Sequence, residues 1–249
     1  MDALFLPPSN LDIPLWRYVD LAKFVAMLQT RALVFAPAVI LDDRFEGSFP
    51  LADSAAERVH RVFAHDERKP TPEQTAILER DLTMVSRRLR VGVSVSCWYA
   101  GEEESLAMWK LYAHDAVCVQ STYRDLCAEL RAPTEPTDDC PEGEYRVGQV
   151  RYINYFKHSI DSLHYLAAFM HKRGAFAHER EVRAIFAEHT PPERPTPKVV
   201  PVDLCKLVHA VLVAPGVPSW FMDTVRRLLH DYALSVPLRR SELDAEPTY

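Results

Sequence analysis

The sequence predicts an α+β fold: one compact domain with a twisted, mixed or antiparallel sheet flanked by helices. Predicted strands and helices alternate irregularly, without a βαβ period or an internal repeat, which does not fit a doubly wound parallel sheet. The 249 residues are 48% hydrophobic, which is enough to build a core. Only seven glycines occur, and none are spaced as a dinucleotide fingerprint or a phosphate loop. A Rossmann dehydrogenase and a P-loop NTPase are therefore excluded.

The strands are predicted from short runs of β-branched and aromatic residues. The clearest run is 91–98, in which Val93, Val95 and Cys97 alternate with Ser94 and Ser96. Pro37 ends the regular pairing of an early strand because proline lacks the N–H that a ladder needs. The expected strands are 12–19, 33–35, 91–98, 116–120, 147–155, 180–186, 199–202, 210–214 and 235–238.

The helices are predicted from apolar residues recurring three and four positions apart. Asp20 can cap the first helix, whose apolar face contains Leu21, Phe24 and Leu28. Residues 132–144 are rich in Pro, Asp, Thr and Glu, and are expected to be a mobile insertion within a single domain that spans 1–249. The expected helices are 21–31, 54–64, 73–89, 102–113, 124–131, 160–173 and 220–232.

The cysteine pattern and the net charge indicate the cellular compartment of the protein and the kinds of ligand it can bind. Five cysteines without a C-x-x-C pair argue against a secreted disulfide scaffold and a thiolate zinc site. No apolar run of 18 residues occurs, and residues 1–10 lack a signal-peptide pattern, so a cytoplasmic protein without membrane contact is expected. The net charge of −6 argues against charge-driven nucleic-acid binding, although a local basic groove stays open. A small molecule or a nucleotide is the expected ligand.

Several separated segments follow one another in the order of a known bacterial family. They are Leu15-Trp-Arg-Tyr18, Asp42-Asp-Arg-Phe-Glu46, Ser94-Val-Ser-Cys-Trp98, Leu106-Ala-Met-Trp-Lys-Leu-Tyr112 and Phe176-Ala-His-Glu-Arg-Glu-Val-Arg183. Together they resemble the bacterial domain-of-unknown-function family 2971, whose corresponding turn is N-D-P-F-E-like and whose helix carries M-W-x-x-Y. The resemblance covers nearly the whole chain. It departs where Asp42 replaces Asn and Arg44 replaces Pro, and the family carries no settled activity.

Glu179 and Glu181 are the sharpest candidate catalytic residues. In a strand, residues two apart point to one face with side chains about 7 Å apart, and Arg183 continues that face. Two carboxylates on one face raise each other's pKa and suit acid–base chemistry. A solvated strand face, on which Glu181 and Arg183 balance each other's charge, is the competing interpretation.

The candidate ligand-binding residues come from four other segments. Arg17 can clamp a phosphate or carboxylate, or it can simply stack beside Trp16 and Tyr18. Ser94 and Ser96 can line a pocket, but no G-x-S-x-G elbow makes either a hydrolase nucleophile. The remaining two candidates are Asp43, in a polar turn, and Trp109, on a helix that packing alone could also explain.

The first functional hypothesis is an enzyme that uses NAD as co-substrate. The order of Arg17, Ser94-x-Ser96 and Glu179-x-Glu181 is similar to the arginine, serine-x-serine and glutamate-x-glutamate order of ADP-ribosyltransferases. That similarity implies that Arg17 holds the pyrophosphate, Glu181 stabilises the oxocarbenium-like transition state, and Glu179 removes the acceptor's proton.

Two alternatives stay open. One is a non-enzymatic binding or effector module of bacterial stress or phage defence, in which Arg17, Asp43, Glu46, Glu181 and Arg183 form a structural ion-pair network. The other is a metal nuclease using Asp43 and Glu181, which lacks the customary E-x-K lysine. A cavity that contains Arg17, Ser96 and Glu181 favours the enzyme, whereas closed ion pairs without a cavity favour the module. No metal ligand set is predicted, because the histidines 164, 171 and 178 do not form a His-Glu-x-x-His motif.

Overall fold

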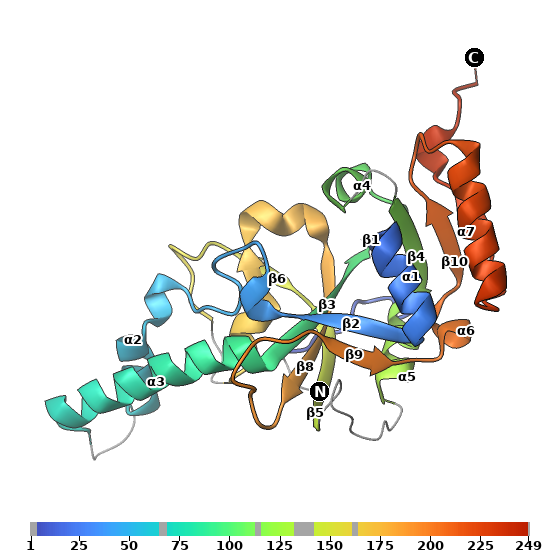
Figure 1. The fold of residues 1–249 in the computed structure, drawn as a ribbon. Helices are drawn as coiled ribbons and strands as arrows, with labels where there is room; N and C mark the ends of the chain where they lie inside the picture. The colour runs from blue at the N-terminus through green and yellow to red at the C-terminus, as the bar shows by residue number, and fades with distance from the viewer. Residues whose placement is uncertain (1–3, 65–68, 113–115, 132–141, 161–163, 249) are drawn as a thin grey trace.

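A computed structural model of the chain describes residues 4–64, 69–112, 116–131, 142–160 and 164–248. Within these residues the centre of the molecule is a mixed sheet of nine strands (Figure 1). All its pairs are antiparallel except that of β10 with β11, so the predicted α+β class is confirmed. The main order is β11 (Leu238–Arg240), β10 (Ala210–Val213), β4 (Ala116–Thr122), β1 (Pro14–Asp20), β3 (Val93–Ala100), β2 (Ala32–Pro37) and β9 (Lys198–Pro201); β8 (Glu181–Glu188) adds to β3, and β5 (Gly143–Gln149) to β8.

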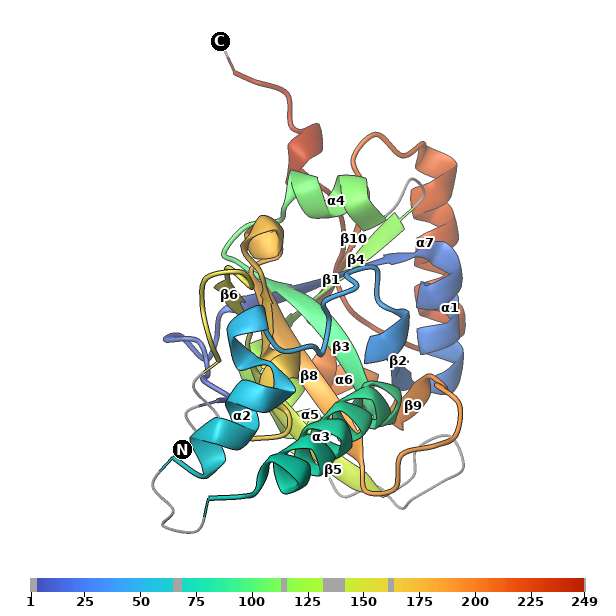
Figure 2. The same cartoon turned by 90° about the vertical axis from the view of Figure 1, so that its left-hand side faces the viewer.

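Helices lie around the sheet, and several of them begin at a side-chain cap. Asp20 accepts a hydrogen bond from the backbone N–H of Lys23, as predicted for the first helix. Thr71 and Gln74 form a capping box that starts the longest helix, which projects with its neighbour α2 at one end of the molecule (Figures 1 and 2). The helices are α1 (Leu21–Thr30), α2 (Ala55–Val62), α3 (Pro72–Gly92), α4 (Leu106–Tyr112), α5 (Tyr123–Arg131), α6 (Leu204–Leu207) and α7 (Ser219–Asp231).

The buried side chains form two apolar clusters. The larger one packs strands β1, β3, β4 and β10 against the surrounding helices, with Phe24, Trp98 and Phe221 almost fully buried. Burying one such side chain stabilises the fold by roughly 1.5–3 kcal/mol. The smaller cluster packs the segment around Leu166 and Phe169 against β3 and β8. It thereby fixes the start of β7 (His171–Arg173) and of the 3₁₀ helix η4 (Gly174–Glu179), which carry part of the site described below.

Strand β3 pairs with β8 along one edge and has two different partners along its other edge. Strand β1 pairs with its C-terminal end, at Tyr99 and Ala100. Strand β2 pairs with its N-terminal half, at Ser94 and Val95. The two partner strands diverge between these points, and the middle of β3 borders an opening between them. This divergence is what makes room for a cavity inside an otherwise continuous sheet.

Two predicted elements are wrong. The single strand at 147–155 is two strands, because β5 ends at Gln149 and β6 (Arg151–Ile153) pairs instead with β7 in a separate small sheet. The helix at 160–173 is replaced by the 3₁₀ helix η3 (Ala167–Met170) followed by β7, with 161–163 outside the described residues. The reason is that residues 166–170 are buried consecutively and not on one side only.

The insertion predicted at 132–144 lies mainly outside the described residues, at 132–141. Its last two residues, Gly143 and Glu144, belong to β5, so that predicted boundary is also wrong. Smaller differences at other element ends come to a few residues. The remaining 3₁₀ helices are η1 (Ala38–Ile40), η2 (Leu51–Asp53) and η5 (Glu242–Asp244).

Candidate functional site

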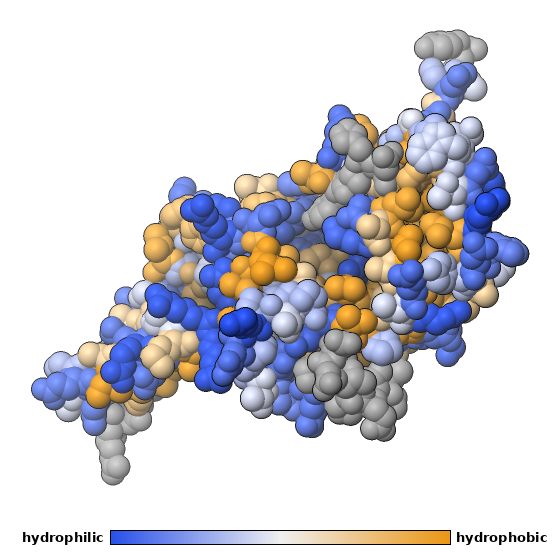
Figure 3. Space-filling model, in the orientation of Figure 1, coloured by the Kyte–Doolittle hydropathy of each residue, from blue (hydrophilic) through white to orange (hydrophobic). Residues whose placement is uncertain are grey.

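A cavity of about 570 Å³ lies where β1 and β2 diverge over β3, with α1, α4 and η4 around it. Figure 3 shows the surface hollowed at the centre of this face. The volume is within the range of sites that hold cofactors or drug-sized ligands. Its walls are mostly apolar and aromatic, and its charged lining residues are Arg17, Lys23, Asp42, Asp43, Glu46, Lys172, Glu179 and Glu181.

Arg17 crosses the gap between the diverging strands. Its guanidinium donates to the Ser96 hydroxyl on β3 and, at 2.8 Å, to the Val34 carbonyl on β2. It also lies over the Trp98 ring, 5.6 Å from the centroid. Among the described residues no carboxylate forms an ion pair with it, and burial lowers the pKa of Arg17 to about 10. A guanidinium that is desolvated and has only neutral partners is an anion-binding group.

Glu181 begins β8 on the opposite wall and is held by a bidentate ion pair. Arg183 donates to both of its oxygens, at 2.6 and 3.0 Å, as expected for residues two apart on one strand face. Burial alone raises the pKa of Glu181, but the attraction and hydrogen bonds of Arg183, with Lys172, outweigh it and hold the pKa at about 2. The carboxylate is therefore negative at every physiological pH.

Lys172 joins the two candidate carboxylates. Its ammonium contacts Glu179 directly and lies 3.5 Å from Glu181. Burial raises the pKa of Glu179 above its ordinary value, and Lys172 only partly offsets this. The two carboxyls thus have pKa values shifted in opposite directions, which is the arrangement that separates a permanent anion from a proton acceptor.

The prediction that Glu179 and Glu181 share a strand face is wrong, although both line the cavity. Glu179 ends η4, and β8 begins only at Glu181. Between them, Arg180 adopts the left-handed conformation with φ of 38°. A non-glycine residue rarely adopts such a backbone, and its cost is of order 1–3 kcal/mol. This single turn brings both carboxylates to Lys172.

The turn after η1 supplies Asp43 and Glu46. Asp43 is almost fully buried and pairs with Arg173, at 2.7 Å. Glu46 is fully buried and accepts a hydrogen bond from Arg183 on one oxygen, while its other oxygen has no hydrogen-bond partner among the described residues. Arg183 therefore joins Glu46 to Glu181, and it also donates a hydrogen bond to the Phe169 carbonyl.

The remaining predicted ligand-binding residues lie behind the cavity wall. Ser96 accepts hydrogen bonds from Arg17 and from the Trp98 indole, at 3.1 Å for the latter, and so orients the guanidinium. Ser94 is fully buried in β3, away from the lining. Trp109 packs edge-on against Tyr18 and donates to Glu104 at 2.6 Å, which fixes α4 at the cavity.

Sequence reasoning missed Lys172 and Cys97. Lys172 was assigned to a helix, and only its place in β7 brings it to Glu179. Cys97 lines the cavity, and burial, followed by the neighbouring charge of Glu181, raises its pKa well above the ordinary value, so its thiol is unreactive. The alternation around Cys97 was the available signal, because it places that side chain on the face of Glu181 and Arg183.

The described residues contain no group of three or more His, Cys, Asp or Glu side chains that could hold a metal ion. Ammonium and guanidinium groups occupy the space between the cavity carboxylates instead. In the same part of the chain, no helix has both the length and the apolar character needed to cross a bilayer.

No protein-family model and no curated protein matches this chain. Among solved structures it is similar to DarT from Thermus sp. 2.9 in complex with NAD⁺, with 8% identity, a TM-score of 0.42, and coverage of 96% of this chain and 100% of the other. The complex of the same protein with ADP-ribosylated ssDNA gives 9% identity, a TM-score of 0.39, and 95% coverage of each chain. The complex of that DarT with carba-NAD⁺ gives 8% identity, a TM-score of 0.40, and coverage of 93% of this chain and 96% of the other. Likenesses this distant establish nothing about the activity of this chain.

Proposed function

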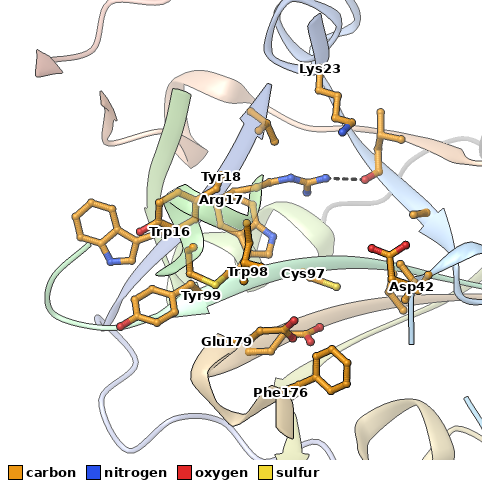
Figure 4. A pocket seen from close by; sticks show the side chains of 18 of the residues that line it. Trp16, Arg17, Tyr18, Lys23, Asp42, Cys97, Trp98, Tyr99, Phe176 and Glu179 are labelled. Carbon is orange, nitrogen blue, oxygen red and sulfur yellow. Dashed lines mark hydrogen bonds between the residues drawn. The ribbon is translucent and has the colours of Figure 1, made fainter. Parts of the chain in front are cut away.

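We propose that this chain binds NAD in the cavity and transfers its ADP-ribose group, with release of nicotinamide. The observation that carries the proposal is the separation of charge across the cavity. Arg17, without an anionic partner among the described residues, and Lys23 lie on one side, and Glu179 lies on the other (Figure 4). Glu181 is joined to Glu179 through Lys172, which contacts both carboxylates. NAD matches this pattern, because its pyrophosphate is negative and its nicotinamide ring positive.

Arg17 binds the pyrophosphate. Its guanidinium is held by Ser96 and the Val34 carbonyl, so little side-chain freedom is lost when the anion arrives. Trp98 and Tyr99 add aromatic surface next to it for the flat parts of the ligand. Lys23 also lines the cavity, where it is exposed and pairs with Asp20 at 2.8 Å, so Arg17 is the main anion-binding group.

Glu181 stabilises the transition state. As the bond between the ribose C1′ and the nicotinamide nitrogen breaks, its electron pair leaves with nicotinamide, and positive charge develops on the ribose. A carboxylate with a pKa near 2 stays negative throughout and stabilises that charge without moving a proton. Its bidentate pairing with Arg183 fixes its position.

Glu179 is the proton acceptor. The attacking oxygen or nitrogen of the acceptor forms the new bond to C1′ and loses its proton to Glu179. Burial raises the pKa of this carboxyl, which makes it a better base than an ordinary glutamate. Lys172, in contact with both carboxylates, keeps them in place.

The test is calorimetric titration of NAD, followed by measurement of nicotinamide release with and without bacterial extract. We expect binding that Arg17→Ala weakens, and release that Glu181→Gln abolishes. Asp53→Asn is the matched control, because Asp53 is also a buried carboxylate but pairs with Arg61 outside the cavity. Absence of NAD binding by the unmodified protein contradicts the proposal.

The closed ion pairs favour a second candidate, a non-enzymatic binding module of stress or phage defence. Asp43 with Arg173, and Glu46 and Glu181 with Arg183, form the network that such a module would need for stability. Arg17 does not belong to that network. A protein that binds NAD without releasing nicotinamide, in any extract, would favour the module. Membership of the domain-of-unknown-function family 2971 stays part of the proposal and fits either candidate.

A further inference from the structure

Glu46 has an unexplained oxygen beside the cavity. Its side chain is fully buried and lines the cavity, and one oxygen accepts from Arg183. The other oxygen, Oε2, is buried without a hydrogen-bond partner among the described residues. Leaving a buried acceptor unsatisfied is costly, so such groups are rare, and a bound group or a catalytic role is one explanation for them.

Its neighbours make Glu46 different from the other buried carboxylates of the cavity. Glu179 contacts Lys172, Asp43 is paired with Arg173 through both oxygens, and Glu181 is paired with Arg183 through both oxygens. Only for Glu46, among these described carboxylates, is one buried oxygen left to accept a new hydrogen bond. It suits an N–H or O–H donor, because a carboxylate accepts and never donates.

We propose that Glu46 Oε2 binds the carboxamide N–H group of nicotinamide; this inference rests on the NAD-binding function proposed above. Arg183 lies between Glu46 and Glu181, so the two carboxylates meet different parts of one ligand. With Glu181 at the ribose, the part of NAD left for Glu46 is the nicotinamide ring, whose carboxamide is its N–H donor. Glu46 is then a specificity residue that distinguishes NAD from dinucleotides lacking this amide.

The charges of Glu46 and of four neighbouring side chains support the same ligand. Glu46, Glu179 and Glu181 carry three negative charges against the two positive charges of Lys172 and Arg183. The excess of one negative charge favours the positively charged nicotinamide ring over an uncharged ring.

The experiment compares three ligands by calorimetry on the full chain: NAD, its 3-acetylpyridine analogue, which has a ketone in place of the amide, and ADP. The unmodified protein is expected to bind NAD about 10- to 100-fold more tightly than the analogue, the usual effect of one hydrogen bond to a charged group. Glu46→Gln is expected to remove most of that preference and to leave ADP affinity within about twofold. Asp53→Asn, which also changes a buried carboxylate, is expected to keep the preference.

Each outcome decides the inference. Equal affinity of the unmodified protein for NAD and the analogue overturns it without any variant, so the test stands even if Glu46→Gln fails to fold. A preference that persists in a folded Glu46→Gln variant also overturns it, while the NAD-binding function survives. If the unmodified protein binds ADP but neither dinucleotide, or binds none of the three, the proposed function and this inference fall together.

Discussion

Replacing Glu181 by glutamine is expected to reduce stability as well as activity. The side chain is 4% exposed and is paired with Arg183 through both oxygens. Glutamine keeps the size but removes the charge, so Arg183 is left with Glu46 as its charged partner. Removing one member of a buried ion pair usually costs about 3–5 kcal/mol, because the other charge stays buried.

The lowered pKa of Glu181 gives a second magnitude for the same ion pair. A carboxyl whose pKa falls from 4.5 in the unfolded chain to about 2 in the fold stabilises the fold by roughly 3 kcal/mol at neutral pH. Since the folded pKa is lowered, this contribution is complete above about pH 5 and is lost as the pH falls toward 2. Roughly half of it is expected to remain at pH 3. Both estimates give a loss of several kcal/mol, within the total stability of an ordinary domain.

The assay is urea denaturation of the unmodified protein and of Glu181→Gln at pH 7, 5, 4 and 3. The difference in the free energy of unfolding is expected to stay constant from pH 7 to 5 and to shrink below pH 4. Asp53→Asn, which removes a different buried carboxylate, is the control: it shows how far acid lowers the free energy of unfolding when Glu181 is intact. A difference that is small at pH 7, or that does not shrink in acid, would refute the assigned ionisation of Glu181.

Four further outcomes are expected. Arg17→Met should weaken NAD binding by at least about tenfold yet change the free energy of unfolding by less than about 1 kcal/mol, because Arg17 has no ion pair to lose among the described residues; calorimetry and urea denaturation measure the two effects. Glu179→Gln should lower the rate of transfer to an acceptor about 100-fold. The transfer rate of the unmodified protein should rise with pH as Glu179 loses its proton, at a pKa above the ordinary 4.5, and the pH–rate profile of the variant should lack this rise. Asp53→Asn should lower the free energy of unfolding by about 1–3 kcal/mol and leave NAD affinity unchanged. Arg180→Gly should keep stability within about 1 kcal/mol, whereas Arg180→Val should lower it further, as thermal unfolding would show, because φ is positive there.

The sequence predicts most of the sheet correctly because its strands are runs of β-branched, aromatic and small residues that suit a buried strand. Strand β3 is the clearest case, since nearly every residue from Val93 to Ala100 is buried between neighbours. The first helix was predicted with its cap, because Asp20 bonds to the backbone only three residues away. Local signals of this kind are available from residues adjacent in sequence, and they need no knowledge of the fold.

The segment between Ile160 and Arg173 could not be predicted, because its conformation depends on distant residues. Leu166, Phe169 and Met170 are buried against β3 and β8 and not along one helix face. The short strand β7 that follows pairs with β6, and this pairing places Lys172 beside Glu179. A lysine that lies between two carboxylates through such tertiary contacts leaves no pattern in the sequence.

The left-handed backbone at Arg180 determines how the two candidate catalytic carboxylates are placed. Regular strand geometry would place Glu179 and Glu181 on one face about 7 Å apart, in similar surroundings, with pKa values shifted in the same direction. The left-handed turn instead ends η4 at Glu179 and starts β8 at Glu181, beside Arg183. Glu179 then has Lys172 as its ion-pair partner among the described residues, whereas Glu181 has Arg183 as well. The opposite pKa shifts that the proposed transfer needs therefore depend on the left-handed turn at Arg180.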